Sequence, residues 1–192
     1  MPKIVERGYE HLIVDLRDNP GGGVEAAYAF AKYIINSKTD IGYFTTNRFI
    51  FEKFDTATFS KLPQIEPETT DDFIEYLKKG IGAKMILSEH QNEVFAGHLY
   101  ILINSNTAST CEPIVHALKG RKNVTVIGET TAGAMLSADY FDLYGKYKLV
   151  LPVADFYTMN GSRLDGLGVS PDILTKSDSA LVKSYQMIQE DG

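Results

Sequence analysis

Two short segments of the chain contain residue types that could together carry out acyl transfer. One is residues 12–23, LIVDLRDNPGGG, where an apolar strand ends in a turn with three consecutive glycines. The other is residues 109–112, STCE, which follows the apolar run 99–103. A serine hydroxyl at the end of a strand can attack a carbonyl carbon, and the N–H groups of a glycine turn can stabilise the resulting oxyanion. The two segments therefore predict a site for acyl transfer.

Ser109 also has a purely structural interpretation. Ser-x-x-Glu at the start of a helix is the signature of a capping box, in which Ser109 and Glu112 satisfy free N–H groups of the first turn. On the tetrapeptide alone, capping is the commoner outcome. The glycine turn in the same chain favours the chemical interpretation, and both interpretations are open at this stage.

Hydropathy patterns predict the elements that place these segments. Residues 12–16 and 99–103 are short apolar runs, typical of fully buried strands in a parallel sheet. Residues 24–36 have apolar side chains at helical spacing, and residues 70–79 have matched helix-end signals. Further predicted elements are two short strands within 41–54, a loop over 56–67, a helix over 109–119, strands over 124–127, 138–143, 147–153 and 156–159, and a final helix over 179–189. Strands that alternate with helices and then pair antiparallel indicate an α/β domain.

Four segments resemble the catalytic core of the C-terminal processing (tail-specific) serine peptidases. They are LIVDLRDNPGG at 12–22, LINSNTASTCE at 102–112, VIGETTAGA at 126–134 and RLDGLGVSPD at 163–172, in the order and spacing of that family. The resemblance implies a crotonase-like or Clp-protease-like α/β fold, with a mostly parallel sheet flanked by helices and antiparallel C-terminal strands. It also implies that residues 1–192 are a peptidase catalytic core, and we expect a fragment without the upstream cap and PDZ regions of the family.

Carried over residue by residue, the resemblance places the family's nucleophile at Ser109. The oxyanion-hole donors fall on the N–H of Gly21 or Gly22 and on the N–H of Thr110. The implied activity is a serine-type peptidase that forms an acyl-enzyme with protein or peptide substrates, without metal or organic cofactor.

The general base is where the sequence departs from the family pattern. Many members have a lysine in a Gly-Lys-Gly turn, but this chain has Ala134 at that position, and Ala138 replaces a glutamine that usually follows. The resemblance is therefore to a branch that lacks the catalytic lysine. The four histidines of the chain are His11, His90, His98 and His116. No pattern in the sequence places any of the four near Ser109. His116 is in the same predicted helix but lies about 10 Å farther along it, at 1.5 Å per residue.

Two hypotheses follow from the missing lysine. In the first, the base is supplied by a segment upstream of the core or by a partner chain, and the protein is a peptidase. In the second, the chain is a catalytically inactive peptide-binding domain that retains the peptidase fold, and Ser109 only caps its helix.

Smaller features have mostly structural interpretations. Asp15 and Arg17 could form an ion pair that holds the glycine turn, and Glu129 could orient the loop that carries the base in other members. Cys111 lies in the first turn of the helix that follows Ser109, where a lowered thiol pKa and a nucleophilic role are conceivable. A small buried cysteine is the commoner finding.

Composition excludes several classes of function. The net charge of −6 and the absence of a basic run argue against nucleic acid or an anionic membrane as partner. Apolar runs are far shorter than the roughly 18 residues of a membrane span, and residues 1–10 lack the apolar centre of a signal peptide. No P-loop, dinucleotide motif or metal-ligand spacing is present. The resemblance implies an exported, periplasmic location in bacteria and leaves a homo-oligomer open.

Overall fold

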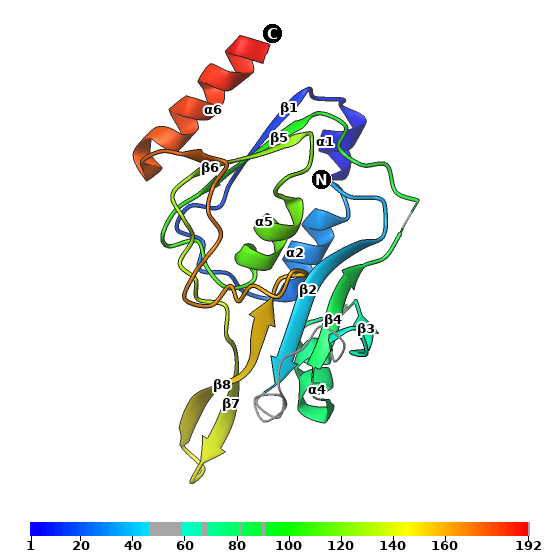
Figure 1. Ribbon diagram of the computed structural model, residues 1–192, viewed down its shortest axis with the longest axis vertical. Helices are drawn as coiled ribbons and strands as arrows, with labels where there is room; N and C mark the ends of the chain where they lie inside the picture. Colours follow the sequence, from blue (N-terminus) through cyan, green and yellow to red (C-terminus); the bar gives the residue numbers. More distant parts are fainter. Residues whose placement is uncertain (47–58, 67–68, 81, 90, 192) are drawn as a thin grey trace.

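Two β-sheets organise the part of the chain that the computed structural model describes, which is residues 1–46, 59–66, 69–80, 82–89 and 91–191 (Figure 1). The elements in chain order are α1 (Pro2–Glu6), β1 (His11–Asp15), α2 (Val24–Ala31), β2 (Thr39–Thr46), β3 (Gln64–Ile65), α4 (Thr70–Lys79), β4 (Gly82–Leu87), β5 (His98–Ile103), α5 (Cys111–Leu118), β6 (Val124–Gly128), β7 (Ser137–Leu143), β8 (Tyr147–Tyr157), β9 (Ile173–Leu174) and α6 (Ser177–Asp191). The predicted α/β architecture is confirmed.

The first sheet is wholly parallel and has the strand order β1-β5-β6-β9. The apolar run of β5 is fully buried, as predicted, because residues 99–103 are inaccessible to solvent. β1 is one of the two edge strands, with β9 at the other edge, and it is only half-buried, so the prediction that β1 is fully buried is wrong. The apolar pattern of a strand does not reveal whether the strand has a neighbouring strand on each side in the sheet.

The second sheet has the order β3-β4-β2-β8-β7, with antiparallel pairs except between β3 and β4. Antiparallel strands were predicted for the C-terminal part alone, whereas β2 and β4 also belong to this sheet. β3 falls within a predicted loop, and the pattern of residues 82–87 predicted no strand. The second strand predicted within 41–54 lies in residues 47–58, outside the described residues.

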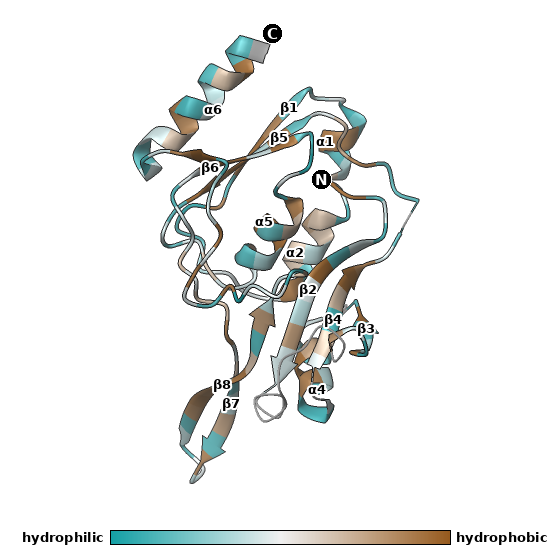
Figure 2. Cartoon of the chain, viewed as in Figure 1, coloured by the Kyte–Doolittle hydropathy of each residue, from teal (hydrophilic) through white to brown (hydrophobic). Residues whose placement is uncertain are grey.

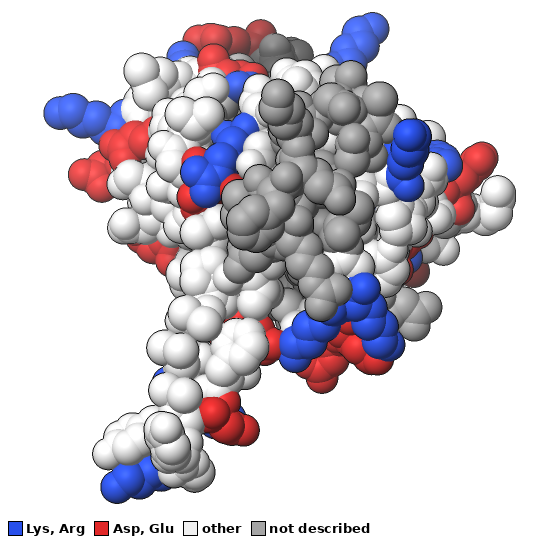
Figure 3. Space-filling view, turned by 60° about the horizontal axis from the view of Figure 1, so that its bottom comes forward, with Lys and Arg blue, Asp and Glu red and all other residues white. Residues whose placement is uncertain are grey.

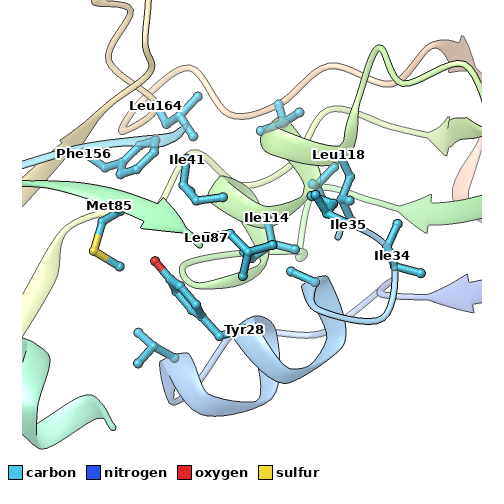
Figure 4. Packing of buried hydrophobic residues seen from close by; sticks show 14 of the residues in the cluster. Tyr28, Ile34, Ile35, Ile41, Met85, Leu87, Ile114, Leu118, Phe156 and Leu164 are labelled. Atoms are coloured by element: carbon cyan, nitrogen blue, oxygen red, sulfur yellow. The ribbon is translucent and has the colours of Figure 1, made fainter. Parts of the chain in front are cut away.

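Helices fill the space between the sheets and cover the outer face of the parallel sheet. One hydrophobic cluster joins Tyr28 of α2, Ile114 of α5, Ile101 of β5 and Phe156 of β8 (Figure 4). On the other face of the parallel sheet, α6 packs against β5 and β6 through a separate cluster that includes Tyr100. α2 and α5 are thereby fixed beside the strand ends that the site requires.

The predicted helices largely agree with the structure. α4 spans the predicted residues 70–79, and the Thr69 hydroxyl accepts a hydrogen bond from the N–H of Asp72, so its N-terminus is capped. α2 stops at Ala31, five residues before the predicted end, and the chain continues in turns. The strands predicted over 147–153 and 156–159 form one strand, β8. None of the described helices is long and apolar enough to cross a bilayer.

β7 and the first part of β8 form an arm, defined here as residues 138–152. Among the described residues, the two strands of the arm pair with each other, and β8 joins β2 from Ala154 onward. The arm projects from the body of the molecule, and several of its residues are apolar (Figures 1 and 2). Its tip is the turn at Tyr144 and Gly145, both with positive φ, as predicted for a hairpin turn.

Candidate active site

Three loops meet at one edge of the parallel sheet. They follow β1, β5 and β6 and comprise residues 16–23, 104–110 and 129–134. Parallel strands place their carboxyl ends on the same side, which is where ligands bind in open α/β sheets. We call this region the serine edge, because it contains Ser109.

The glycine turn and the serine loop are in direct contact at the serine edge. A Cβ atom placed on Gly21 would lie 2.6 Å from Ser109 Cβ and 2.8 Å from the carbonyl oxygen of Ala108. Gly21 also has a φ of +91°, which side-chain-bearing residues rarely adopt. The Ala108 N–H donates to the carbonyl oxygen of Asn19 at 3.0 Å. Glycine is therefore required at position 21 for two reasons, the turn conformation and the approach to Ser109.

Ser109 itself has a left-handed backbone conformation, with φ of +55°. Non-glycine residues in this region cost energy, and such conformations concentrate at functional sites. α5 begins two residues later at Cys111, and its N-cap residue, Thr110, makes no side-chain capping bond. Within the described residues, Ser109 Oγ makes no hydrogen bond, and the N–H of Glu112 donates to the Ser109 backbone oxygen instead. The serine half of the predicted capping box is thus not formed.

The Glu112 carboxylate is completely buried and accepts four hydrogen bonds. Oε2 accepts from the N–H groups of Ser109 and Ala134, both at 3.0 Å, and Oε1 accepts from the Gly133 N–H at 2.8 Å and the Thr131 hydroxyl at 2.6 Å. The Ser109 bond is the glutamate half of a capping box. The other three reach loop 129–134, so Glu112 joins the Ser109 turn to the loop in which many family members carry the base.

A second group of polar side chains joins the first two loops. Asp18 accepts from the side-chain amides of Asn106 at 2.8 Å and Asn104 at 3.0 Å, and its own N–H donates to Asn104 Oδ1. The Thr107 hydroxyl donates to the carbonyl oxygen of Leu16 at 2.7 Å. The Asn106 and Asn104 amides lower the pKa of Asp18 because they stabilise its charged form. The loops are therefore held by hydrogen bonds between residues far apart in the chain.

The three predicted oxyanion donors are differently placed. The Gly21 N–H donates to Asn19 Oδ1, and the Gly22 N–H donates to the Thr110 hydroxyl, both at 3.0 Å. The Thr110 hydroxyl in turn donates to the Gly22 carbonyl oxygen. The Thr110 N–H makes no hydrogen bond within the described residues. Thr110 alone presents a free amide beside Ser109, whereas both glycine amides are engaged.

An apolar pocket of about 330 Å³ opens beside this turn. Its lining combines the glycine turn with side chains from β1, α2 and the first turn of α5, including Val14, Ala27, Phe30, Cys111 and Ile114. A pocket of this kind can hold an apolar side chain of a bound peptide while the adjoining carbonyl lies at the serine.

Three further interpretations are resolved by the structure. Asp15 and Arg17 form the expected ion pair at 2.6 Å, and Arg17 also donates to the carbonyl oxygen of Ser177. Glu129 accepts from the N–H of Ser177 at the start of α6 rather than orienting loop 129–134. Burial raises the pKa of the Cys111 thiol, with a further contribution from the Glu112 charge, so the lowered thiol pKa considered for this residue is wrong.

A base for Ser109 is not found among the described side chains. His98 pairs with the Thr125 hydroxyl at 2.8 Å, at the opposite end of β5. His116 lies in the last turn of α5, and burial lowers its pKa. Ala134 occupies the loop held by Glu112 but has no titratable group. No cluster of three or more potential metal ligands occurs in the described part of the chain.

Sequence reasoning missed part of this site. The hydrogen bonds of Asp18, Asn104 and Thr107 between the loops were not predicted. Nor was the engagement of the Gly21 amide by Asn19 and of the Gly22 amide by Thr110. The only available signal was composition, since Asp, Asn and Thr at strand ends favour local side-chain to backbone bonding. That tendency does not identify partners 86 to 91 positions apart.

Comparisons with known proteins agree with this geometry. The model of Peptidase family S41 matches residues 1–175. The carboxyl-terminal-processing peptidase 1 of Arabidopsis thaliana chloroplasts is 24% identical over 172 residues, which is 90% of this chain and 29% of that protein. The carboxyl-terminal-processing protease of Synechocystis is 26% identical over 170 residues, 88% of this chain and 32% of that protein. The chain thus spans about a third of the length of these relatives.

Solved structures show the same fold. The photosystem II D1 C-terminal processing protease aligns with a TM-score of 0.63 and 24% identity, over 92% of this chain and 37% of that chain. The tricorn protease aligns with a TM-score of 0.57 and 17% identity, over 97% of this chain and 15% of that chain. At this level of identity the likeness establishes the fold.

Proposed function

The chain belongs to peptidase family S41, and on that premise we propose that it is the catalytic core of a serine-type peptidase with Ser109 as nucleophile. The observation that carries the proposal is the contact of Gly21 with Ser109 at the carboxyl ends of β1 and β5. This contact brings a strained serine turn against a glycine turn and beside an apolar pocket.

In the proposed reaction, Ser109 Oγ attacks the carbonyl carbon of a peptide bond while its proton passes to a base. The tetrahedral oxyanion is stabilised first by the free Thr110 N–H. Gly21 and Gly22 become donors when the carbonyl oxygen displaces Asn19 Oδ1 and the Thr110 hydroxyl, their present acceptors. Collapse expels the amine with that proton and leaves an acyl-enzyme on Ser109, which water then hydrolyses.

Substrates are proposed to be proteins or peptides cleaved near the carboxyl terminus, as the names of the relatives state for those proteins. The apolar pocket beside Thr110 would receive a side chain next to the cleaved bond. Because relatives occur in bacteria and chloroplasts, we also propose an exported or organellar site of action.

The base is proposed to come from outside residues 1–192, either from sequence upstream of the core or from a partner chain. This proposal rests on the unbonded Ser109 Oγ and on the alanine at position 134. It predicts that the isolated chain reacts only through the small fraction of Ser109 that ionises on its own. The rate with an activated ester should then rise about tenfold per pH unit through pH 9, without a plateau.

Labelling with a fluorophosphonate probe tests the nucleophile. Mass spectrometry should locate the adduct on Ser109, and Ser109→Ala should abolish it. Ser105→Ala is the matched control, because Ser105 lies exposed in the same loop and should leave labelling unchanged. Labelling elsewhere, or equal labelling of Ser109→Ala, would show that Ser109 is not the nucleophile. Equal and strong labelling of this chain and of a longer version would refute an external base.

The inactive peptide-binding domain remains the second candidate, favoured by one observation. Both glycine amides already have acceptors, so two of the three proposed oxyanion donors are engaged in this structure. For this candidate, peptides bind the wild type and Ser109→Ala with the same affinity, and neither protein turns them over even when a longer chain is used.

A further inference from the structure

The arm, residues 138–152, consists of two strands, which is less structure than a β-ribbon needs to be stable by itself in water. Two-stranded antiparallel ribbons are marginal in water unless a third strand or another layer packs on them. Among the described strands, β7 pairs with β8 alone, and one ion pair joins Asp139 of β7 to Lys78 of α4. In the space-filling view the arm stands clear of the body (Figure 3).

The two faces of the arm differ in chemistry. Directly opposed residues of an antiparallel pair point to the same face. Phe141 therefore shares a face with Leu149, and Leu143 shares it with Tyr147. Leu151, opposite Asp139, extends this face toward the body of the molecule. We call these five side chains the apolar arm face.

The opposite face of the arm is already partly satisfied. Tyr140 opposes Val150, and Asp142 opposes Lys148. Lys148 Nζ lies 3.9 Å from Asp142 and 5.9 Å from the Tyr140 ring centroid, so this face contains its own ion pair and cation–π contact. On the apolar arm face, Lys146 Nζ lies 5.2 Å from the Tyr147 ring centroid, and Asp139, opposite Leu151, forms an ion pair with Lys78 of α4. The other side chains of this face are apolar.

The exposed apolar area is what a dimer interface requires. Phe141, Tyr144 and Tyr147 are 40%, 98% and 60% exposed. At roughly 200 Å² per aromatic residue, Phe141 and Tyr147 of the apolar arm face together expose about 200 Å² of side chain, and Tyr144 in the adjoining tip turn exposes about 200 Å² more. Leu143, Leu149 and Leu151, each about two-fifths exposed, add to this. A standard interface buries about 800 Å² per partner, of which about 500 Å² is apolar in homodimers.

We propose that the apolar arm faces of two copies of this chain pack against each other about a two-fold axis. In such an isologous contact each face meets its own copy, so one patch of sufficient area serves both partners. The product is a small sandwich of two ribbons, with the layers about 10 Å apart, as in other sheet pairs. Each arm thereby gains the second layer that it lacks.

A second copy fits the arm better than a bilayer does. The apolar arm face runs the full length of the arm, from Leu151 near the body to Tyr147 near the tip, whereas a membrane would contact the tip alone. Asp139 and Asp142 lie along the same length, and the chain has a net charge of −6, which disfavours an anionic lipid surface.

Light scattering during size-exclusion chromatography tests the proposal with a matched pair of variants. The wild type should elute with twice the 21.3 kDa mass of the chain. Leu149→Lys should raise the dimer dissociation constant at least 30-fold. Val150→Lys introduces the same charge at the next residue of β8, on the opposite face, and should leave the dissociation constant within about threefold.

Cross-linking gives a test that does not depend on how the lysine variants fold. In a Cys111→Ser background, Leu149→Cys should form a covalent dimer when diamide oxidises the two thiols, and Val150→Cys should not. A wild type that stays monomeric at 200 µM would overturn the proposal. So would equal weakening by both lysine variants, or binding of a monomeric wild type to phosphatidylserine vesicles that Leu149→Lys abolishes.

Discussion

The serine edge and the arm are built by opposite means. At the serine edge, buried polar groups join three loops, and Glu112 alone accepts four hydrogen bonds while wholly inaccessible to solvent. In the arm, the two strands pair with each other, one ion pair joins Asp139 to Lys78 of α4, and Tyr144 at the tip is 98% exposed. The structure of the serine edge depends on specific hydrogen-bond partners, whereas the packing of the arm depends on which of its two faces is apolar.

This difference determines how each region should respond to substitution. A buried polar group that loses its partner leaves a desolvated donor or acceptor behind, and that penalty is large. An exposed side chain that changes leaves nothing unsatisfied in the monomer. The same chemical change should therefore cost much more at the serine edge than in the arm.

The largest effect is expected for Glu112→Gln, which keeps the shape of the side chain but replaces one acceptor oxygen with an NH2 group. That group faces N–H donors that have no other acceptor, so the free energy of unfolding should fall by about 4 kcal/mol. Urea unfolding measures the loss. Glu129→Gln is the control, since its carboxylate accepts from the Ser177 N–H, and it should cost less than about 1 kcal/mol. Equal losses of unfolding free energy in Glu112→Gln and Glu129→Gln would contradict the prediction that the Glu112 hydrogen bonds stabilise the fold more.

Gly21→Ala and Gly145→Ala compare the two regions with one substitution. Both glycines have positive φ, +91° and +77°, but a methyl at Gly21 meets Ser109 Cβ at 2.6 Å and a methyl at Gly145 meets nothing within 4 Å. Gly145→Ala should cost about 1 kcal/mol from backbone strain, and Gly21→Ala about 2 kcal/mol more from the clash. Urea unfolding and fluorophosphonate labelling provide the readouts. Labelling should fall at least tenfold in Gly21→Ala only.

Acidification should loosen the serine edge through Asp18. Its pKa is lowered in the folded state by the Asn106 and Asn104 amides, so its contribution to stability is present above the ordinary Asp pKa and is lost as pH falls through the lowered value. The difference in unfolding free energy between wild type and Asp18→Asn should be constant from pH 8 to about 5 and shrink below about pH 4. A difference that grows on acidification would contradict this assignment.

The smallest effect is expected for Val150→Lys in the arm. Val150 is 51% exposed and lies on the face that already contains the Asp142–Lys148 pair. The free energy of unfolding should change by less than about 0.5 kcal/mol. A loss approaching that of Gly21→Ala would show that the arm is as tightly specified as the serine edge.

The sequence predicted the elements and the proximity of the two site segments better than it predicted their bonding. The run 99–103 indicated a buried strand, and the helix-end signals gave the bounds of α4, because both depend on local pattern. The burial of β1 was overestimated, since an edge position depends on sheet order. The four hydrogen bonds of Glu112 and the engaged glycine amides depend on where distant loops meet. The local hydropathy pattern of a single sequence carries no information about such contacts.

The link between the two regions is very short. Only Met135 and Leu136 separate Ala134, whose N–H is bound by Glu112, from the first residue of β7. Met135 is buried, and its N–H donates a hydrogen bond to Asp165, so the conformational freedom of this linker is restricted. A displacement of the arm is therefore expected to move the backbone at Ala134, which Glu112 connects to Ser109, because no flexible hinge lies between them. For immobilisation or labelling, the exposed outer side of α6 is a safer attachment point than the hairpin.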